Sequence, residues 1–399
     1  MSIRKLTEKD LKKAGELAYY CFGTGQDPWP EEEIKQYNDT YNLEYCLGYF
    51  DGDELVSTWI VFPWEIFIRG SILKFGGVAD VTTQPEYRRR GQIRELFLYS
   101  LKQMKDNGII ISALSPFKYS YYEMFGYEIC TESRILKTNP KEIILPGDFT
   151  LLKVKEIKKD ESFEKLIKIR NQVGKNYTLI KIPDKKTWNI RKFTKEDKII
   201  GIFDENSTIV GYIIYRLKKL PSGDWDIAIV IREMITISRD AFYTALDYIK
   251  KHGDQIMEFQ IPLLDNELTF SNFYEKDNVK IETKSHDMFR IVDVKKCIEA
   301  INYDKKIDTT FTLCINDKHA EWNNGSFIIT IKNCKAQVER KEVTDIDLEI
   351  DINSFTQLFT GYQSIEQIVY RAKAKVKKEK MKIINDIYPI CPTRILTHF

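Results

Sequence analysis

The sequence predicts an α/β protein made of two related halves and a third, C-terminal segment. The chain has 399 residues, which is enough for two or three domains with a large core. Hydrophobic residues make up 43% of it and charged residues 30%, a composition typical of globular proteins. The order strand, strand, strand, helix, strand occurs twice along the chain. This repetition indicates two mixed-sheet units of one type.

The first half is expected to begin with a helix. Thr7–Asp10 has the form of a capping box and precedes apolar residues at helical spacing. Two strands joined by the Asp51-Gly52 turn follow, and then a further strand over residues 72–83. Apolar residues at three- and four-residue steps predict an amphipathic helix from Arg90 to the Asn107-Gly108 stop.

A short apolar strand over residues 109–116 and a helical piece over 119–125 complete the first half. The second half repeats the pattern without an arginine-glycine segment, and its elements are expected over residues 197–220, 225–235, 238–253 and 254–263. A third segment with alternating strands begins near Met288. The expected domains are therefore 1–147, 148–287 and 288–399.

Composition argues against several classes of function. The formal net charge is +2, from 61 basic and 59 acidic residues, which gives no overall field for holding nucleic acid. No stretch approaches the roughly 18 apolar residues that span a bilayer, and the N-terminus lacks an apolar run of signal-peptide type. We therefore expect a cytoplasmic protein without membrane contact. The basic run over residues 371–382 is interpreted as a solvated helix face, with nucleic-acid or lipid binding as the alternative.

The cysteines do not indicate a metal centre. Seven of them are scattered singly without a CxxC pair, and only four histidines accompany them. Metal-ligand spacing is therefore absent, and no metal site is expected. Most of these thiols are interpreted as reduced, small apolar groups of the core, and this includes Cys130, for which an acyl-accepting role is the alternative.

The segment VADVTTQPEYRRRGQIR, from Val78 to Arg94, carries the strongest functional signal. A strand leads into three arginines and Gly91 at the start of a helix. A helix N-terminus offers unpaired N–H groups and a partial positive charge to phosphates, and flanking arginines add forked donors. The edge of the preceding strand suits an extended pantetheine arm. The segment therefore predicts the pyrophosphate cradle of an acetyl-CoA site, with a solvated turn as the alternative.

The run Arg88-Arg89-Arg90-Gly91-Gln92-Ile93 resembles motif A of the GNAT acetyltransferases, Arg/Gln-x-x-Gly-x-Gly/Ala, with Ile93 in place of the last Gly or Ala. With the downstream SPFKYSYYEMFGYE, the chain is similar to the Eis (enhanced intracellular survival) branch, which commonly has a bulky residue there. The resemblance spans the whole chain. It implies a catalytic GNAT domain, a second GNAT-like domain without cofactor, a sterol-carrier-protein-like C-terminal domain, and a hexameric assembly.

The resemblance also implies roles for individual residues. Tyr122, four residues before Gly126, matches the general acid, and the terminal carboxylate of Phe399 matches the general base. From the residues alone, core packing stays the alternative for Tyr122, and a tail packed on its own domain the alternative for Phe399. The residues that match acetyl-CoA contacts are Val81, Thr82, Thr83, Arg88, Arg89, Arg90, Gly91, Gln92, Ile93, Arg94, Phe117 and Lys118.

The acceptor implied by the resemblance is a primary amine of an aminoglycoside, a polyamine or a lysine side chain. Residues 26–33 (QDPWPEEE) lie where GNAT acceptor loops usually sit, although the three glutamates are equally suited to the start of a helix. The rival hypothesis is a non-catalytic binding protein with a degenerate transferase fold and an apolar ligand in its C-terminal domain. Retention of RRRGQIR, Tyr122 and the apolar terminus favours the enzyme.

Overall fold

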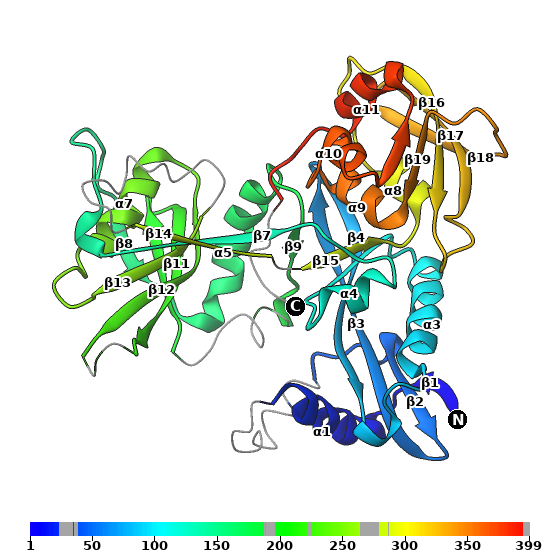
Figure 1. The fold of residues 1–399 in the computed structure, drawn as a ribbon. Helices are drawn as coiled ribbons and strands as arrows, with labels where there is room; N and C mark the ends of the chain where they lie inside the picture. The colour runs from blue at the N-terminus through cyan, green and yellow to red at the C-terminus, as the bar shows by residue number, and fades with distance from the viewer. Residues whose placement is uncertain are drawn as a thin grey trace. The chain divides into compact units, whose positions relative to one another are not determined.

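The computed structural model describes residues 1–23, 35, 39–186, 188, 196–221, 223, 225–263, 279–285 and 287–393. The chain forms two compact units. The first comprises the described residues of Met1–Thr131, Tyr177–Pro183 and His286–Phe399, and the second those of Glu132–Asn176 and Asp184–Ser285. Both units combine mixed sheets with helices, which confirms the predicted α/β class (Figure 1).

An eight-stranded sheet forms the N-terminal part of the first unit. The strands are β1 (Ser2–Lys5), β2 (Cys46–Asp51), β3 (Glu54–Ile68), β4 (Ser71–Thr83), β5 (Ile111–Leu114), β15 (Met288–Ile291) and β6 (Glu128–Ile129) in that spatial order, with β9 (Ile180–Ile182) paired to β3. β4 runs parallel to β5, and β3 is antiparallel to β4. The turn, strands and helix predicted over residues 46–106 are all present.

Two helices cover opposite faces of this sheet. α1 (Leu11–Phe22) follows the Thr7–Asp10 capping box, which the structure confirms. Leu17 of α1 shares a core with Ile60 of β3, whereas Leu96 of α3 (Gln92–Asp106) shares a second core with Val61. Neighbouring residues of a strand point to opposite faces, so the two helices lie on the two sides of β3.

The C-terminal segment is joined to this sheet by β15, which lies between β5 and β6 and is antiparallel to both. All four residues of β15 are buried. A five-stranded sheet and four helices follow in the same unit. They are β18 (Lys335–Arg340), β17 (Gly325–Lys332), β16 (Thr309–Asn316), β19 (Leu348–Asp351) and β20 (Ala374–Val376) in spatial order, with α8 (Val294–Ala300), α9 (Ile352–Thr360), α10 (Ile365–Tyr370) and α11 (Met381–Ile387).

The basic run over residues 371–382 is not a helix face, and that expectation was wrong. Its centre is β20, in which a half-buried alanine and valine flank the exposed Lys375. Lys375 pairs with Glu349 on the neighbouring strand, and Lys377 pairs with Asp345 and Asp347. The alternation of lysine with small apolar residues has a period of two, which suits a sheet edge better than a helix.

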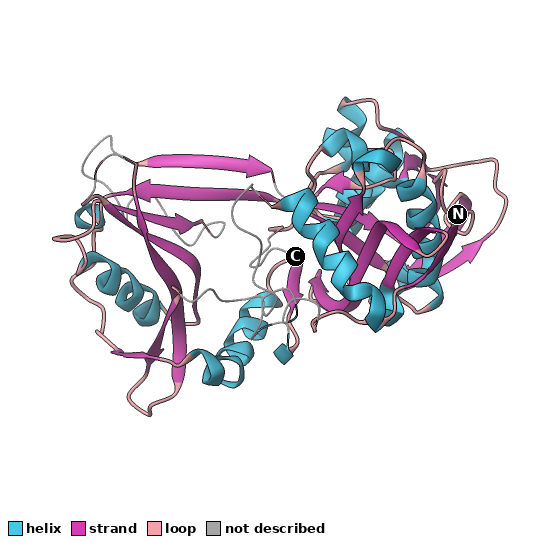
Figure 2. Cartoon of the chain, turned by 90° about the horizontal axis from the view of Figure 1, so that it is seen from below, coloured by secondary structure: helices cyan, strands magenta, loops and turns pink. Residues whose placement is uncertain are grey.

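The second unit has a seven-stranded sheet with helices packed against it (Figure 2). α5 (Lys159–Gly174) and α7 (Arg239–Lys250) both contact β11 and β12. The strands, in spatial order, are β14 (Lys280–Ser285), β7 (Glu132–Thr138), β13 (Glu258–Pro262), β12 (Ile227–Thr236), β11 (Ile209–Lys219), β10 (Lys198–Phe203) and β8 (Lys153–Glu156).

Two segments lie in a different unit from the one that the expected boundaries suggest. β7, within the expected domain 1–147, pairs with β13 and β14 of the second unit. β9, within the expected domain 148–287, pairs with β3 of the first unit. Local patterns predict a strand but not its partner, because sheet neighbours can be distant in sequence. No helix among the described residues is both long and apolar enough to cross a bilayer.

Candidate active site

The parallel strands β4 and β5 pair over only part of the length of β4. Their register runs from Phe75 opposite Ile111 to Val78 opposite Leu114, where β5 ends. β4 continues to Thr83 and, among the described residues, pairs there with β3 alone. The last five residues of β4 therefore present one edge that is not used by a neighbouring strand, next to the end of β5. Such an edge can receive an extended chain by strand addition.

A β-bulge lies in this same part of β4. Thr58 of β3 pairs with Thr82, but Ile60 pairs with Ala79, so that β4 has one residue more than β3 in this stretch. The extra residue gives Asp80 a left-handed backbone, with φ of 49°. The Thr58 hydroxyl donates to the Asp80 carbonyl oxygen at 2.6 Å. Bulges of this kind bend a strand and redirect its backbone groups, and they are frequent beside active sites.

Two side-chain hydrogen bonds stabilise the bulge. The Tyr41 hydroxyl donates to Oδ2 of Asp80 at 2.5 Å, and the hydroxyls of Thr58 and Thr82 lie 2.5 Å apart. Thr82 is therefore buried and turned towards β3, while Val81 and Thr83 are half-buried. Of the three predicted coenzyme A contacts on β4, Thr82 is suited to contribute through its backbone and not through its hydroxyl.

The arginine-glycine segment forms the turn that leads into α3. Arg89 and Gly91 both have left-handed backbones, with φ of 63° and 88°. Gly91 is the N-cap of α3, and no side chain among the described residues caps this helix start. The first N–H groups of α3 are therefore available to an anion, with the partial positive charge of a 15-residue helix behind them.

The predicted side chains around this turn divide into two groups. Arg88, Arg89, Arg90 and Arg94 are exposed, and Arg90 donates to the Glu86 carbonyl oxygen at 2.7 Å. Gln92 is buried, and Ile93 packs partly against the core beneath α3. Ile93, which departs from the family motif, is thus a packing residue here, and the arginines present their forked donors at the surface.

Tyr122 lies on α4 (Tyr119–Glu123), which follows β5. Its side chain is only 3% exposed, and its ring contacts Phe117, Tyr121 and Tyr127. Burial, with smaller contributions from Tyr121 and Tyr127, raises the pKa of Tyr122 above the usual range for tyrosine. Its hydroxyl has no hydrogen-bond partner among the described residues. Tyr122 is therefore a protonated, unengaged donor on the helix that follows β5.

The other two predicted residues of this loop are accessible. Phe117 is 69% exposed and Lys118 is exposed as well. Cys130, by contrast, is fully buried, and burial raises the pKa of its thiol well above the usual range. A buried thiol that is kept protonated is a poor nucleophile, so the packing interpretation of Cys130 is the one that the structure supports.

Phe399 and residues 26–33 lie outside the described residues. The chain that leads to Phe399 is described as far as Thr393 and is held at several points. Arg69 donates to the carbonyl oxygens of Phe359 at 2.7 Å and Pro389 at 2.9 Å. The Thr178 N–H donates to the Pro392 carbonyl oxygen at 3.0 Å. The tail is thus fixed against the β3–β4 turn and the segment before β9.

The second unit has a related arrangement that lacks an open helix start. β12 runs parallel to β13, as β4 does to β5, and α7 follows β12. Ser238 caps α7 by accepting from the Ala241 N–H at 3.2 Å. Asp240, in the first turn of α7, accepts from the Thr150 N–H at 3.2 Å. The start of α7 is therefore occupied by groups of the protein itself, whereas the start of α3 in the first unit is uncapped.

Comparison with known proteins agrees with this geometry. The family model of the acetyltransferase (GNAT) domain matches residues 2–130, which contain β4, the arginine-glycine turn and Tyr122. The chain contains a GNAT acetyltransferase domain. In this acetyltransferase, residues 294–392 match the sterol carrier protein domain. No curated protein shows significant sequence similarity to it.

Solved structures similar to this GNAT acetyltransferase span its whole length. A GCN5-related N-acetyltransferase from Anabaena variabilis ATCC 29413 has a TM-score of 0.87 at 20% identity, with 100% of both chains covered. A probable N-acyltransferase from Enterococcus faecalis V583 has a TM-score of 0.86 at 20% identity, covering 100% of this chain and 99% of its own. Eis1 from Mycobacterium abscessus has a TM-score of 0.82 at 16% identity over 100% of both chains.

These likenesses show that the acetyltransferase has the Eis-like fold, as the sequence predicts: a GNAT domain, further mixed sheets and a C-terminal sterol-carrier-type domain. An enzyme of this type uses an acyl-coenzyme A and an amine acceptor in general. The match therefore favours the enzyme over the non-catalytic binding protein. Sequence patterns do not single out Tyr41 and Arg69 as residues of the site, whereas Asp80 is marked by being a charged residue inside the apolar segment VADV.

Proposed function

We propose that the chain is an acetyl-CoA-dependent N-acetyltransferase that acts on a primary amine of an aminoglycoside, a polyamine or a lysine side chain. One observation carries the proposal. The unpaired edge of β4 lies next to the end of β5, the uncapped start of α3 follows β4, and Tyr122, with its unengaged hydroxyl, lies on the helix that follows β5. These three features suit the pantetheine arm, the pyrophosphate and the leaving sulfur of one acetyl-CoA.

Each predicted contact has a part in this proposal. The pantetheine amides pair with the backbone of Val81, Thr82 and Thr83. The pyrophosphate lies on the N–H groups of Gly91, Gln92, Ile93 and Arg94, where Gly91 supplies the left-handed turn. Arg88, Arg89 and Arg90 meet the outer phosphates with forked donors. The exposed Phe117 and Lys118 line the approach to Tyr122.

The reaction in this proposal is a direct attack by the amine on the thioester carbonyl. The C–N bond forms, the amine proton passes to the terminal carboxylate of Phe399, and the C–S bond breaks. Tyr122 then donates its proton to the departing thiolate, which leaves as coenzyme A. At pH 7 only about one alkylamine in 2,500 is neutral, so removing the proton from the attacking amine costs about 4.6 kcal/mol. A nearby base offsets this cost.

Burial raises the pKa of Tyr122, which keeps its proton in place but makes the proton harder to release. A free thiol has a pKa near 8.5 and tyrosine near 10, so the transfer in water is uphill by about 2 kcal/mol. The departing thiolate is buried in the same surroundings, and burial raises the pKa of a thiol too. The pKa values of Tyr122 and of the thiol therefore shift in the same direction, so the free-energy cost of the proton transfer stays small.

The remaining expectations belong to the same proposal. Residues 1–147 form the catalytic domain, 148–287 a second GNAT-like domain without cofactor, and 288–399 the domain that supplies the carboxylate, except that β7 belongs to the second sheet and β9 to the first. The capped start of α7 supports the absence of a second acetyl-CoA site. Assembly into a hexamer is inferred from the family resemblance and a cytoplasmic location from the composition of the sequence. Light scattering on the purified protein tests the hexamer.

A thiol-release assay tests the proposed function. Purified protein is mixed with acetyl-CoA and, in separate reactions, an aminoglycoside, spermidine and a lysine-containing peptide. We expect amine-dependent release of coenzyme A and an acetylated product, identified by its mass, with at least one of these classes. Binding of acetyl-CoA without turnover on any amine would contradict the transferase and leave the binding protein.

A further inference from the structure

The position of Tyr122 is not fixed by its own helix. α4 has only five residues, and isolated helices of that length are not stable. The Phe125 and Tyr127 N–H groups donate to the Tyr122 carbonyl oxygen at 3.0 and 3.2 Å, so the turn after α4 is coupled directly to Tyr122. Whatever holds this turn, residues 123–127, therefore also holds Tyr122.

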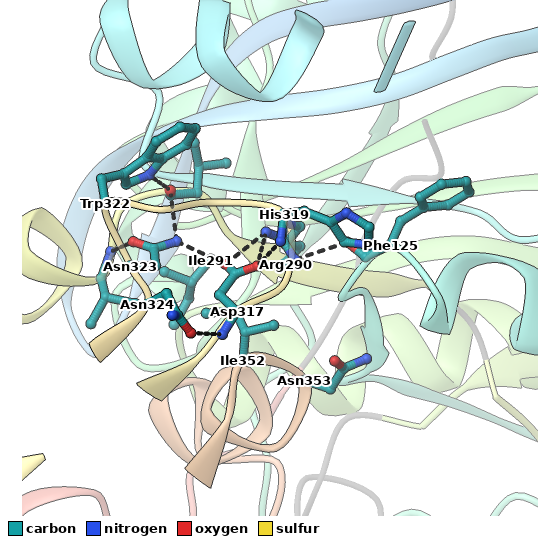
Figure 3. Close-up of polar contacts among 12 residues, drawn as sticks. Phe125, Arg290, Ile291, Asp317, His319, Trp322, Asn323, Asn324, Ile352 and Asn353 are labelled. Atoms are coloured by element: carbon teal, nitrogen blue, oxygen red, sulfur yellow. Dashed lines mark hydrogen bonds and ion pairs between the residues drawn. The ribbon is translucent and has the colours of Figure 1, made fainter. Parts of the chain in front are cut away.

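Three side chains of the C-terminal segment donate to carbonyl groups of this turn, and Figure 3 shows the bond from Arg290 to Phe125. Nη1 of Arg290 donates to the Phe125 oxygen at 2.8 Å. Nε2 of His319, in the tautomer that carries its proton there, donates to the Met124 oxygen at 2.7 Å. Nδ2 of Asn353 donates to the Glu123 oxygen at 3.2 Å and the Tyr127 oxygen at 2.9 Å. We call these three residues the carbonyl clamp.

The clamp residues come from three separate elements of the first unit. Arg290 lies on β15, His319 follows β16, and Asn353 lies in the first turn of α9. Four carbonyl oxygens of a five-residue turn are thus bound by donors that are far away in sequence. A turn held from three directions has little freedom to rotate, so the hydroxyl of Tyr122 is fixed as well.

Asp317 holds two parts of the clamp together. It accepts from Nη2 of Arg290 at 2.9 and 2.7 Å, and from the backbone N–H of His319 at 3.0 Å. Nδ2 of Asn323 adds a third donor at 3.1 Å. The side chains of Arg290 and Asp317 are both fully buried. A buried ion pair adds little net stability because desolvation offsets the attraction, so its main contribution here is to fix where the guanidinium lies.

Gly126 makes this approach possible. It has φ of 82°, and a Cβ at this position would lie 1.7 Å from Nη1 of Arg290. Any larger residue would therefore displace the guanidinium from the turn. The ring of Phe97 packs against both Arg290, at 5.6 Å, and His319, at 5.4 Å. The glycine and the clamp thus form one tightly packed arrangement beneath the turn.

We propose that Arg290, His319 and Asn353 are positioning residues for acetyl transfer: the C-terminal segment holds the turn at residues 123–127 and thereby aims Tyr122 at the departing sulfur. This inference rests on the proposed role of Tyr122 as the general acid. It gives the C-terminal segment a second part in catalysis, separate from the terminal carboxylate. Misplacing a catalytic group by about 1 Å can cost about 10²-fold in rate, so a loosened turn is expected to show in kcat.

The test uses the full chain with two clamp variants, Asn353→Ala and His319→Leu. Asn353 is half-buried, so its truncation is compatible with folding. We expect each variant to lower kcat roughly tenfold while the KM for acetyl-CoA stays within about twofold. His319→Gln, whose Nε2 can reach the same carbonyl, should recover most of the rate. Asn385→Ala is the matched control, because Asn385 bonds Glu366 and the Ile365 N–H, away from the turn.

A double-variant comparison separates positioning from general support of the fold. If the clamp acts through Tyr122, Asn353→Ala should have no further effect on the residual kcat of Tyr122→Phe. The same fall in both backgrounds, or no fall in the wild-type background, would overturn the inference. Normal turnover by Tyr122→Phe itself would instead overturn the proposed role of Tyr122. Where His319→Leu fails to fold, Asn353→Ala and His319→Gln still decide the matter.

Discussion

Nη2 of Arg69 donates to the carbonyl oxygen of Pro389 at 2.9 Å and so ties the turn between β3 and β4 to the C-terminal tail. The same guanidinium donates to the Phe359 and Leu358 oxygens of α9, and its Nη1 to Sγ of Cys391. Arg69 has a left-handed backbone, with φ of 49°. A half-buried charge that bonds Pro389 and Cys391 of the tail as well as α9 is a suitable anchor for a chain end that we propose as the base.

Replacing Arg69 by methionine should loosen the tail and slow acetyl transfer. The change removes the Arg69 donors to the tail and leaves the Leu358 and Phe359 carbonyl oxygens of α9 without this partner, at a cost of about 1–3 kcal/mol. We expect faster hydrogen exchange over residues 389–393 and a lower kcat, with acetyl-CoA affinity unchanged. Arg4→Met is the control, since Arg4 pairs with Asp10 near the surface. If the tail of Arg69→Met exchanges faster but its kcat equals that of the wild type, Arg69 has no part in the mechanism.

Replacing Gly91 by valine should weaken acetyl-CoA binding at least tenfold, or ~1.4 kcal/mol. No atom lies within 4 Å of a Cβ placed there, so the expected effect comes from the φ of 88°, which a β-branched residue does not readily adopt. Gly147→Val is the matched control, because that glycine is equally open but lacks a positive φ. Equal affinities of both variants and the wild type for acetyl-CoA, measured by titration calorimetry, would show that the pyrophosphate does not bind at this turn.

The pH dependence of kcat tests which group is the acid. Catalysis needs Tyr122 protonated, and this form is lost only as the pH rises through its pKa. Burial raises that pKa above the usual value near 10, so we expect no acid-related fall in kcat between pH 7 and about 9.5. Profiles are measured at saturating amine and acetyl-CoA. A fall with an apparent pKa near 8 that persists in Tyr122→Phe would assign the acid to another group.

Adding one or two residues after Phe399 tests the terminal carboxylate. The extension keeps the aromatic ring but converts the carboxylate to an amide and moves the new charge by ~3.5 Å per residue. A catalytic base should not tolerate this, and we expect the extended protein to bind acetyl-CoA but to transfer acetyl groups at least about 10²-fold more slowly. If the C-terminally extended protein turns over as fast as a control with the same extension at its N-terminus, the carboxylate of Phe399 is not the base.

Local signals in the sequence predicted most of the elements that build the candidate site. The capping box at Thr7–Asp10, the Asp51-Gly52 turn and the periodicity of α3 each depend on neighbouring residues, and the structure contains all three. Strand partners were less predictable. β15 pairs with β5, and the paired residues are 174 to 180 positions apart (Met288 with Leu114, Ile291 with Ile111). Buried apolar strands of similar length carry no local signal that identifies such a distant partner.

The same distinction holds at the site. The arginine-glycine turn and Tyr122 belong to continuous segments with recognisable patterns. Arg290, Asp317 and Asn353 are single polar residues in unrelated segments, and their convergence on the turn after α4 arises only when β15 enters the first sheet. A charged residue within the apolar run MFRIV was the available signal for Arg290. Its partner Asp317 has no comparable mark.

The most direct test of the account is the rate of acetyl transfer by Tyr122→Phe at saturating acetyl-CoA, followed as thiol release with an amine that the wild-type protein accepts. The phenyl ring preserves the packing against Phe117 and Tyr121 but lacks the proton. We predict a kcat at least about 10²-fold lower, acetyl-CoA affinity within about twofold of wild type, and near-normal turnover in the Tyr121→Phe control. Wild-type turnover by Tyr122→Phe would contradict the assignment of the general acid and, with it, the central claim about how this site works.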